Sequence, residues 1–227
     1  MDLRGKFIVF DGTEGCGKST QVQMLRQRLE GEPLGRGIEV VVVRDPGSTR
    51  IGEQVRQILL NPSHDEMGMR CEMLLYMSAR AQMMHETIVP ALEAGKLVLC
   101  DRFVSSTLAY QLGGDGLTAE EISRVAEVAI RGRWPDLTFI LDMPAGESLA
   151  RAKPKFLLPF PDEVKSKMAA EMVKDRIEQR PLEYHERVRA NYLEQAKRWP
   201  GRYRVVRADR GKEQVHEEIW RGVQNAE

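Results

Sequence analysis

Cysteine and histidine are scarce in this sequence. Its three cysteines form no Cys-x-x-Cys pair, and only four histidines are scattered among the 227 residues. Disulfide frameworks and zinc sites need these residues at close, repeated spacings, so neither is expected here. Unpaired cysteines favour a reducing compartment, and we therefore expect a cytoplasmic protein.

The chain also lacks a net charge and a long apolar run. Its 34 Lys and Arg residues balance 34 Asp and Glu residues, so binding to nucleic acid or to an anionic membrane is not expected. No run of ~18 apolar residues occurs, and Asp2 and Gly12 interrupt the beginning, so we expect no signal peptide and no membrane span. Residues 1–150 hold 16 basic and 21 acidic side chains, whereas residues 151–227 hold 18 and 13. An anion would be drawn to the C-terminal third.

Five short apolar runs alternate with helical patterns along the chain. The predicted strands cover residues 6–11, 38–44, 97–100, 137–142 and 203–207. The predicted helices cover residues 19–30, 51–59 and 70–94, begin again near 105, 118 and 212, and dominate 146–199. Parallel strands need helical crossover connections. We therefore predict an α/β fold in which helices flank both faces of a five-stranded parallel sheet, as a single domain over residues 1–227.

One motif carries most of the chemical information. Residues 12–19 have the sequence GTEGCGKS and match G-x-x-x-x-G-K-[ST], between a predicted buried strand and an amphipathic helix. In this motif backbone N–H groups surround a phosphate, the Lys reaches the outer phosphates and the Ser oxygen binds Mg²⁺. The residues predicted to bind ATP are Gly12, Thr13, Glu14, Gly15, Cys16, Gly17, Lys18, Ser19 and Thr20.

A second candidate pair follows the predicted strand 97–100. Ligands of parallel α/β sheets bind beyond the carboxyl ends of the strands, where Asp101 and Arg102 fall. Asp can hold Mg²⁺ and Arg can clamp a phosphate, although a surface ion pair is the alternative for these two residues. Asp142 also ends a strand, and support of the following turn is its favoured role. The guanine-binding Asn-Lys-x-Asp motif is absent, which favours a nucleotide or small-metabolite kinase over a GTPase.

Four segments resemble the thymidylate kinase family, and they occur in order along nearly the whole chain. These segments are residues 7–21, 44–48, 101–111 and 136–142. The resemblance implies a P-loop fold of the nucleoside monophosphate kinase type, transfer of the γ-phosphoryl group of ATP to dTMP, a requirement for Mg²⁺ and a homodimer. Three alternatives stay open: a related kinase with another nucleoside monophosphate acceptor, a regulatory nucleotide-binding protein, and a non-specific nucleic-acid binder.

The resemblance also implies which residues bind dTMP. Tyr76, where family members usually have Phe, would stack on the thymine ring, and Arg80 would hydrogen-bond the base. Arg44 and Arg102 would grip the phosphate, with Pro46 in a cis peptide turning Arg44 toward the site. The full set implied at dTMP is Glu14, Arg44, Tyr76, Arg80, Arg102, Ser106, Thr107, Tyr110 and Gln111.

Cys16 departs from the pattern of those family members that have Arg at this P-loop position. The resemblance then implies that a mobile lid over about residues 151–176 supplies the cations, from Arg151, Lys153 and Arg176. Residues 154–174 form an insertion longer than the usual lid, either a tolerated surface loop or a modified lid or subunit contact. The predicted catalytic residues are Lys18, Asp101, Arg102, Arg151 and Lys153, with Ser19 and Asp101 as metal ligands.

Overall fold

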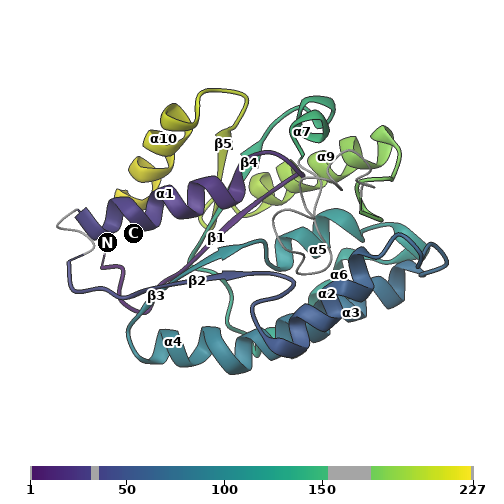
Figure 1. Ribbon diagram of the computed structural model, residues 1–227, viewed down its shortest axis with the longest axis horizontal. Helices are drawn as coiled ribbons and strands as arrows, with labels where there is room; N and C mark the ends of the chain where they lie inside the picture. The colour runs from purple at the N-terminus through teal and green to yellow at the C-terminus, as the bar shows by residue number, and fades with distance from the viewer. Residues whose placement is uncertain (1, 32–35, 153–174, 226–227) are drawn as a thin grey trace, which may run out of the picture.

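A single parallel sheet forms the centre of the molecule (Figure 1). The computed structural model describes residues 2–31, 36–152 and 175–225. The strands lie in the order β2-β3-β1-β4-β5, and every neighbouring pair is parallel. Their bounds are β1 (Phe7–Gly12), β2 (Val40–Arg44), β3 (Leu97–Asp101), β4 (Leu137–Asp142) and β5 (Tyr203–Arg207). The predicted five-stranded parallel sheet is confirmed.

Helices cover both faces of this sheet, as predicted. One face packs against α1 (Lys18–Gly31) and α10 (Lys212–Gln224), and the other face carries the remaining larger helices (Figure 1). The remaining α-helices are α2 (Arg50–Leu60), α3 (Met69–Met83), α4 (Val89–Glu93), α5 (Val104–Tyr110), α6 (Ala119–Ile130), α7 (Ala145–Arg151) and α9 (Leu182–Arg198). None of the helices in the described ranges is long and apolar enough to cross a bilayer.

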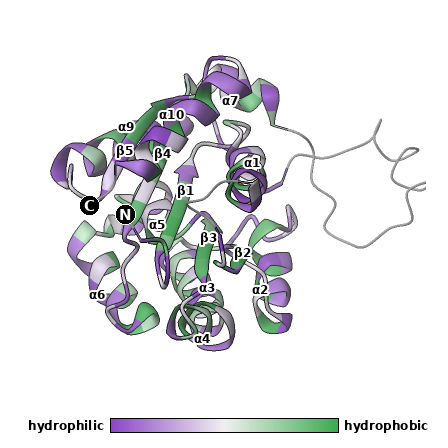
Figure 2. Cartoon of the chain, turned by 90° about the vertical axis from the view of Figure 1, so that its left-hand side faces the viewer, coloured by the Kyte–Doolittle hydropathy of each residue, from purple (hydrophilic) through white to green (hydrophobic). Residues whose placement is uncertain are grey.

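The central strand β1 shows why the apolar runs are uninterrupted. Phe7 and Val9 belong to the core on the α3 and α6 side, whereas Ile8 and Phe10 belong to the core under α1 and α10. Successive side chains of a strand point to opposite faces, and here both faces are covered. Figure 2 accordingly shows β1 and β3 in the green of apolar residues between helices with hydrophilic outer surfaces.

The register of the sheet brings the predicted chemical residues to one edge. Arg44 at the end of β2 pairs with Asp101 at the end of β3, and Asp101 also pairs with Phe10 of β1. Gly12 pairs with Leu141 of β4. The loop of residues 12–19, called the P-loop below, and the Asp101-Arg102 pair therefore begin at the same end of the sheet.

The helical region predicted over residues 70–94 is interrupted. A π-helical segment, η2 (Met84–Ile88), lies between α3 and α4. Pro90 stands at the start of α4 and has no N–H with which to continue the i→i−4 hydrogen bonds of the helix. The preceding residues form a wider, π-helical turn instead. Lys153 and the predicted insertion at 154–174 lie outside the described residues.

Candidate active site

The glycine-rich loop of residues 12–19 joins β1 to α1 in a conformation that requires glycine. Gly12 has φ +140° and Gly15 has φ +76°. A Cβ on Gly12 would lie 2.5 Å from the carbonyl oxygen of Leu141, and one on Gly15 would lie 2.1 Å from that of Ser148. Because backbone from β4 and α7 approaches this closely, only glycine fits at either position.

Lys18 is held across the loop by backbone oxygens. Its Nζ donates to the carbonyl oxygens of Thr13 at 2.6 Å and Gly12 at 3.3 Å, and its side chain is buried. The Cys16 Sγ lies 3.6 Å from the same nitrogen. Burial raises the pKa of the Cys16 thiol, so this position carries no charge. Lys18 is therefore the cation contributed by the loop itself.

Ser19 and Asp101 meet at the start of α1. The Ser19 hydroxyl donates to Asp101 Oδ2, although the two residues belong to different elements. Mg²⁺ usually takes one or two protein oxygen ligands and completes its shell with water and phosphate oxygens. A hydroxyl and a carboxylate side by side next to Lys18 fit that requirement. The described residues hold no cluster of three or more His, Cys, Asp or Glu that could bind a metal by itself.

Arg102 is partly buried at this edge, with its side chain 14% exposed. Its backbone has φ +72°, which non-glycine residues rarely adopt. Its Nη1 donates to the Gly12 carbonyl oxygen at 2.9 Å, and its Nη2 donates to Glu14 Oε1 at 2.6 Å. Burial alone would lower the pKa of Arg102, but Glu14 and the other acidic groups nearby raise it overall, so the guanidinium stays charged.

A buried polar cluster supports Arg102 from behind. The Tyr192 hydroxyl of α9 accepts from Arg102 Nη1 at 3.2 Å and donates to Asp11 Oδ1 at 3.0 Å. The hydroxyls of Ser105 and Ser106 also donate to the Asp11 carboxylate. Burial raises the pKa of Asp11, and the nearby Arg102 opposes this shift. Nothing in the local sequence around Tyr192 or Asp11 indicated this contact.

One cavity of about 650 Å³ connects the P-loop with α2, α3 and α5. It lies within the size range of small-molecule sites. All nine residues implied at the acceptor line it, together with Gly15, Gly17, Lys18, Ser19, Thr20, Asp101 and Arg151. Of the predicted ATP-binding residues, Gly12, Thr13 and Cys16 do not line it, and all three are buried. The lining contains six basic and four acidic side chains, an excess that suits a polyanionic ligand.

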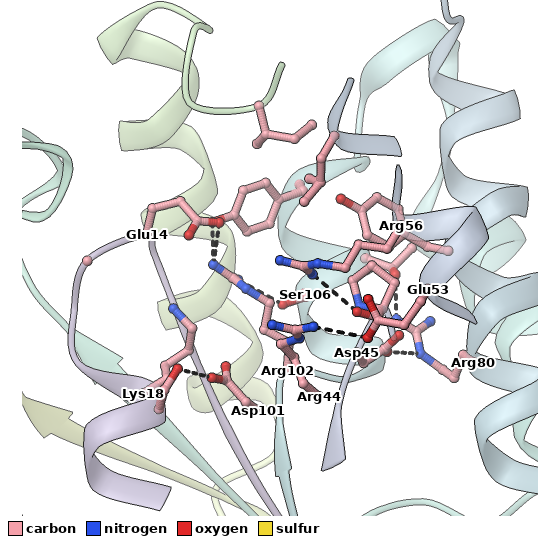
Figure 3. A pocket seen from close by; sticks show the side chains of 18 of the residues that line it. Glu14, Lys18, Arg44, Asp45, Glu53, Arg56, Arg80, Asp101, Arg102 and Ser106 are labelled. Atoms are coloured by element: carbon pink, nitrogen blue, oxygen red, sulfur yellow. Dashed lines mark hydrogen bonds and ion pairs between the residues drawn. The ribbon is translucent and has the colours of Figure 1, made fainter. Parts of the chain in front are cut away.

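Three arginines share the middle of this cavity (Figure 3). Arg44 Nη2 donates to Glu53 Oε1 at 3.0 Å, and Arg56 Nη1 donates to the carbonyl oxygen of Pro46 at 3.1 Å. Burial and the neighbouring Arg44 lower the pKa of Arg56. The Asp45–Pro46 peptide is cis, as expected. Arg56 was not predicted, because the sequence offers only its position on an amphipathic helix.

Arg80 of α3 lies at the far end of the cavity and is fixed by its own partners. Its Nε donates to Asp45 Oδ2 at 2.6 Å, and both side chains are 1% exposed. Its Nη2 donates at 3.1 Å to the Phe103 carbonyl oxygen and to Thr107 Oγ1. Tyr76, one turn earlier on α3, lines the same end, and burial raises the pKa of its hydroxyl.

The candidate lid cations are separated in the structure. Arg151 ends α7 and lines the cavity. Arg176 does not line it: its Nη2 donates to Glu72 Oε2 and its Nε to the Leu59 carbonyl oxygen at 3.0 Å. Lys153 is outside the described residues. Asp142 forms a two-bond ion pair with Arg189 of α9, at 2.6 and 2.9 Å.

Comparisons with known proteins agree on one family. A sequence model of the family described as "Thymidylate kinase" matches residues 10–219. The chain is 42% identical over 217 residues to thymidylate kinase from Pelotomaculum thermopropionicum, which covers 96% of this chain and 92% of the relative. It is 41% identical to the enzyme of that name from Halothermothrix orenii, over 97% of both chains. A crystal structure of thymidylate kinase from Ehrlichia chaffeensis superimposes with a TM-score of 0.72 at 28% identity, covering 96% of this chain and 98% of that one.

Proposed function

The chain belongs to the thymidylate kinase family, and from this premise we propose how the cavity described above performs the family's reaction. The protein is an ATP-dependent kinase that transfers the γ-phosphoryl group to dTMP, giving dTDP and ADP, in deoxynucleotide synthesis. The observation that carries the residue assignments is that Lys18 and Arg102 line one cavity with Arg80 and Tyr76. One end suits phosphates and the other suits a base.

The acceptor phosphate would bind at Arg44, Arg56 and Arg102. In the structure these arginines bond carboxylates or backbone oxygens, with Glu14 on Arg102 and Glu53 on Arg44. A phosphate monoester carries up to two negative charges at pH 7 and offers three oxygens, so it competes well with a single carboxylate. Binding of dTMP would therefore exchange Glu14 or Glu53 for phosphate oxygens at these guanidinium groups.

The reaction needs alignment and charge neutralisation more than proton transfer. The second pKa of a phosphate monoester is about 6, so its attacking oxygen is already anionic at neutral pH. No general base is required. Lys18 and Arg102 would stabilise charge on the transferring group and hold two mutually repelling anions in line. Arg151 would contribute positive charge from the side of the ATP phosphates. Lys153 and Arg176 would stabilise the transferring group only if the lid brings them to the cavity.

Ser19 and Asp101 would hold the divalent metal of the donor nucleotide. Their adjacent hydroxyl and carboxylate oxygens support this proposal. When bound, Mg²⁺ supplies positive charge to the phosphate oxygens of ATP. The work of the chain is to place these two oxygens next to Lys18, so that metal and ammonium neutralise the same phosphates.

The test is ADP release from Mg-ATP with dTMP, dUMP, UMP, CMP, AMP, GMP or thymidine as acceptor. We expect turnover largely confined to dTMP, abolished in Lys18→Ala and Arg102→Ala and by removal of Mg²⁺ with EDTA. Arg124→Ala, which removes a fully surface ion pair with Glu120 on α6, is the matched control and should retain full activity. Preference for a different acceptor, or unchanged activity in the Lys18 and Arg102 variants, would overturn the residue assignments.

The same panel measures how the base is read. A missing methyl group is worth ~1–3 kcal/mol in an apolar pocket, so dUMP should be phosphorylated measurably but about 5- to 150-fold less efficiently than dTMP. Equal efficiency with the two substrates would show that the pocket does not recognise the methyl group.

We also propose a homodimer in the cytoplasm. Apolar side chains stand exposed on α2, α3 and α6, which pack against one another: Ile51, Ile58, Leu74 and Val128. Burial of such residues against a second copy would remove them from water. Cys16, Cys71 and Cys100 are all free thiols, and exposed Cys71 fits a reducing compartment.

A further inference from the structure

A buried carboxylate on α3 lies where the acceptor pocket meets the chain that follows the insertion. Glu72 is 0% exposed, one helical turn before Tyr76 and two turns before Arg80. Its Oε2 accepts from Arg176 Nη2 and, at 2.7 Å, from Arg180 Nη2. Its Oε1 accepts from the side-chain amide of Gln111 at 2.7 Å. The two oxygens thus serve different partners.

The bond to Gln111 determines which way the amide points. A side-chain amide has one donor end and one acceptor end, whereas an ionised carboxylate only accepts. Two guanidinium groups balance the charge of Glu72, so its Oε1 can bind Gln111 only through Nε2. The carbonyl oxygen Oε1 of Gln111 is left as the free end, and no group in the described part of the chain hydrogen-bonds it.

Gln111 ends the helix that also provides Thr107 and Tyr110 to the cavity. It lines the cavity although its residue is only 1% exposed. Arg80 lies at the same end, and four of its five N–H groups already have partners. The Nε–H donates to Asp45, the two Nη2 hydrogens donate to Phe103 and Thr107, and one Nη1 hydrogen donates to Met77. One Nη1 hydrogen is left. This end of the cavity therefore offers a base one fixed acceptor and one fixed donor.

That pattern selects between pyrimidines. Thymine and uracil present an N3–H donor next to the O4 acceptor, whereas cytosine presents an N3 acceptor next to an amino donor. We propose that Glu72 is a positioning residue that locks the Gln111 amide with its oxygen toward the base, and so lets the site accept thymine and reject cytosine. This inference rests on the proposed binding of dTMP in the cavity.

The experiment compares dTMP with dCMP, using kcat/KM for turnover and titration calorimetry for binding. In Glu72→Gln an amide replaces the carboxylate and can bond either end of Gln111, so the amide can turn. We expect the ratio of kcat/KM for dTMP over dCMP to fall at least about tenfold. The Gln111 amide can then turn its N–H toward cytosine N3, so cytosine no longer meets an acceptor facing its own acceptor. Both kcat/KM values come from the same preparation, so their ratio does not depend on the fraction of the protein that is folded.

Four further variants separate positioning from simple support: Arg180→Met, Gln111→Ala alone, Gln111→Ala with Glu72→Gln, and Glu72→Asp. Arg180→Met removes one partner of Glu72 Oε2 but leaves the Gln111 bond, so it should change activity with both substrates and leave their ratio within threefold. Adding Glu72→Gln to Gln111→Ala should cause no further change in the ratio, since the effect acts through Gln111. Glu72→Asp keeps the charge for both arginines but withdraws the carboxylate from Gln111, and serves if Glu72→Gln does not fold; it too should lower the ratio.

The outcomes distinguish this inference from the proposed function. A ratio within threefold of the native protein in both folded Glu72 variants would overturn the role of Glu72 while leaving dTMP kinase activity intact. A native protein that binds dTMP in preference to dCMP without phosphorylating it would overturn the function but keep the base selection. Loss of the ratio in Arg180→Met as well would reduce Glu72 to general support of the helix.

Discussion

Arg102 shows how much of this site depends on one side chain. It joins the P-loop, α5 and α9 through bonds to Gly12, Ser106, Tyr192 and Glu14, and it does so from a left-handed backbone position. Such strain costs of order 1–3 kcal/mol and persists where surrounding contacts enforce it. A planar group with five donors makes these bonds at once, and a lysine ammonium does not match that geometry.

We therefore expect Arg102→Lys to be nearly as inactive as Arg102→Ala. If Arg102 stabilises charge on the transferring group, as we propose, its loss should lower kcat/KM by roughly 10²-fold or more. Steady-state kinetics with dTMP measures the effect, and Arg124→Lys on the surface of α6 is the matched control. Activity of Arg102→Lys within fivefold of the native value would show that charge alone suffices.

Two buried histidines make stability depend on pH. Burial lowers the pKa of His185 on α9 and of His216 on α10 from the usual 6.5. Below pH 6.5 the unfolded chain binds protons that the folded chain refuses, so the free energy of unfolding falls as the pH falls toward the lowered pKa values. Urea unfolding at pH 7.5, 6.5 and 5.5 should show this loss of stability. His185→Leu should make the free energy of unfolding depend less steeply on pH. His85→Gln, at an exposed position, is the control; an unchanged slope in His185→Leu with His216→Gln combined would contradict the prediction.

Some site residues belong to a local sequence motif, whereas others depend on partners far away along the chain. The loop that holds Gly12, Lys18 and Ser19 could be placed from the sequence, because the spacing of a local motif sets its geometry. Glu72 and Tyr192 were not predictable, because their partners lie at distances along the chain that no local pattern encodes: Arg176 is 104 residues from Glu72, and Asp11 is 181 residues from Tyr192. Arg176, one of the candidate lid cations implied by the resemblance, bonds Glu72 in this structure.

At the scale of elements, the start of α3 matters because this helix carries Glu72, Tyr76 and Arg80. Gly68 at its N-cap has no capping side chain. Asp115, from the loop before α6, supplies the missing acceptor: its Oδ2 accepts from the N–H groups of Met69 at 2.6 Å and Arg70 at 3.4 Å. A carboxylate at a helix N-terminus satisfies free donors and interacts favourably with the helix dipole.

Asp115→Gly should destabilise the protein by about 1 kcal/mol, as expected for loss of a helix cap. Glycine suits the left-handed backbone of Asp115, which has φ +49°, so the change isolates the capping interaction. Asp115→Asn keeps an oxygen acceptor and should cost less than half as much. Chemical denaturation measures both, with the surface variant Glu120→Ala as control; equal stability of Asp115→Gly and the native protein would exclude the cap.

Element prediction succeeded where burial sets the pattern and failed where packing between elements decides it. The apolar runs of β1 and β3 are strands buried on both faces, and α6 begins directly after Thr118, where a helix start was expected. The π-helical turn η2 was missed because helical periodicity does not record one extra residue in a turn. Ile51 and Ile58 of α2 look like core positions in the sequence but are exposed in the single chain.

For the whole molecule, those exposed positions predict a dimer. Sedimentation equilibrium should give twice the 25.8 kDa mass of one chain. Leu74→Glu would place a charge among the apolar residues of α3 and should shift the protein toward the monomer. Val205→Glu on the edge strand β5 introduces the same charge elsewhere and should leave the mass unchanged. A native monomer, or dissociation by both variants alike, would contradict the proposal.

The order of the strands also sets when the site can first exist. β1 is synthesised before the other four strands of this sheet, and its neighbours in the sheet are β3 and β4, the latter ending at Asp142. Ribosomes add ~5–20 residues per second, so the ~130 residues between the end of β1 and the end of β4 take on the order of 10 s to emerge. During that interval the glycine-rich loop of residues 12–19 is attached to a strand that lacks at least one of its neighbours. A nascent chain therefore completes the strand pairing on both sides of β1 only after residue 142 has been translated, and ATP can stabilise the folded loop only from that point on.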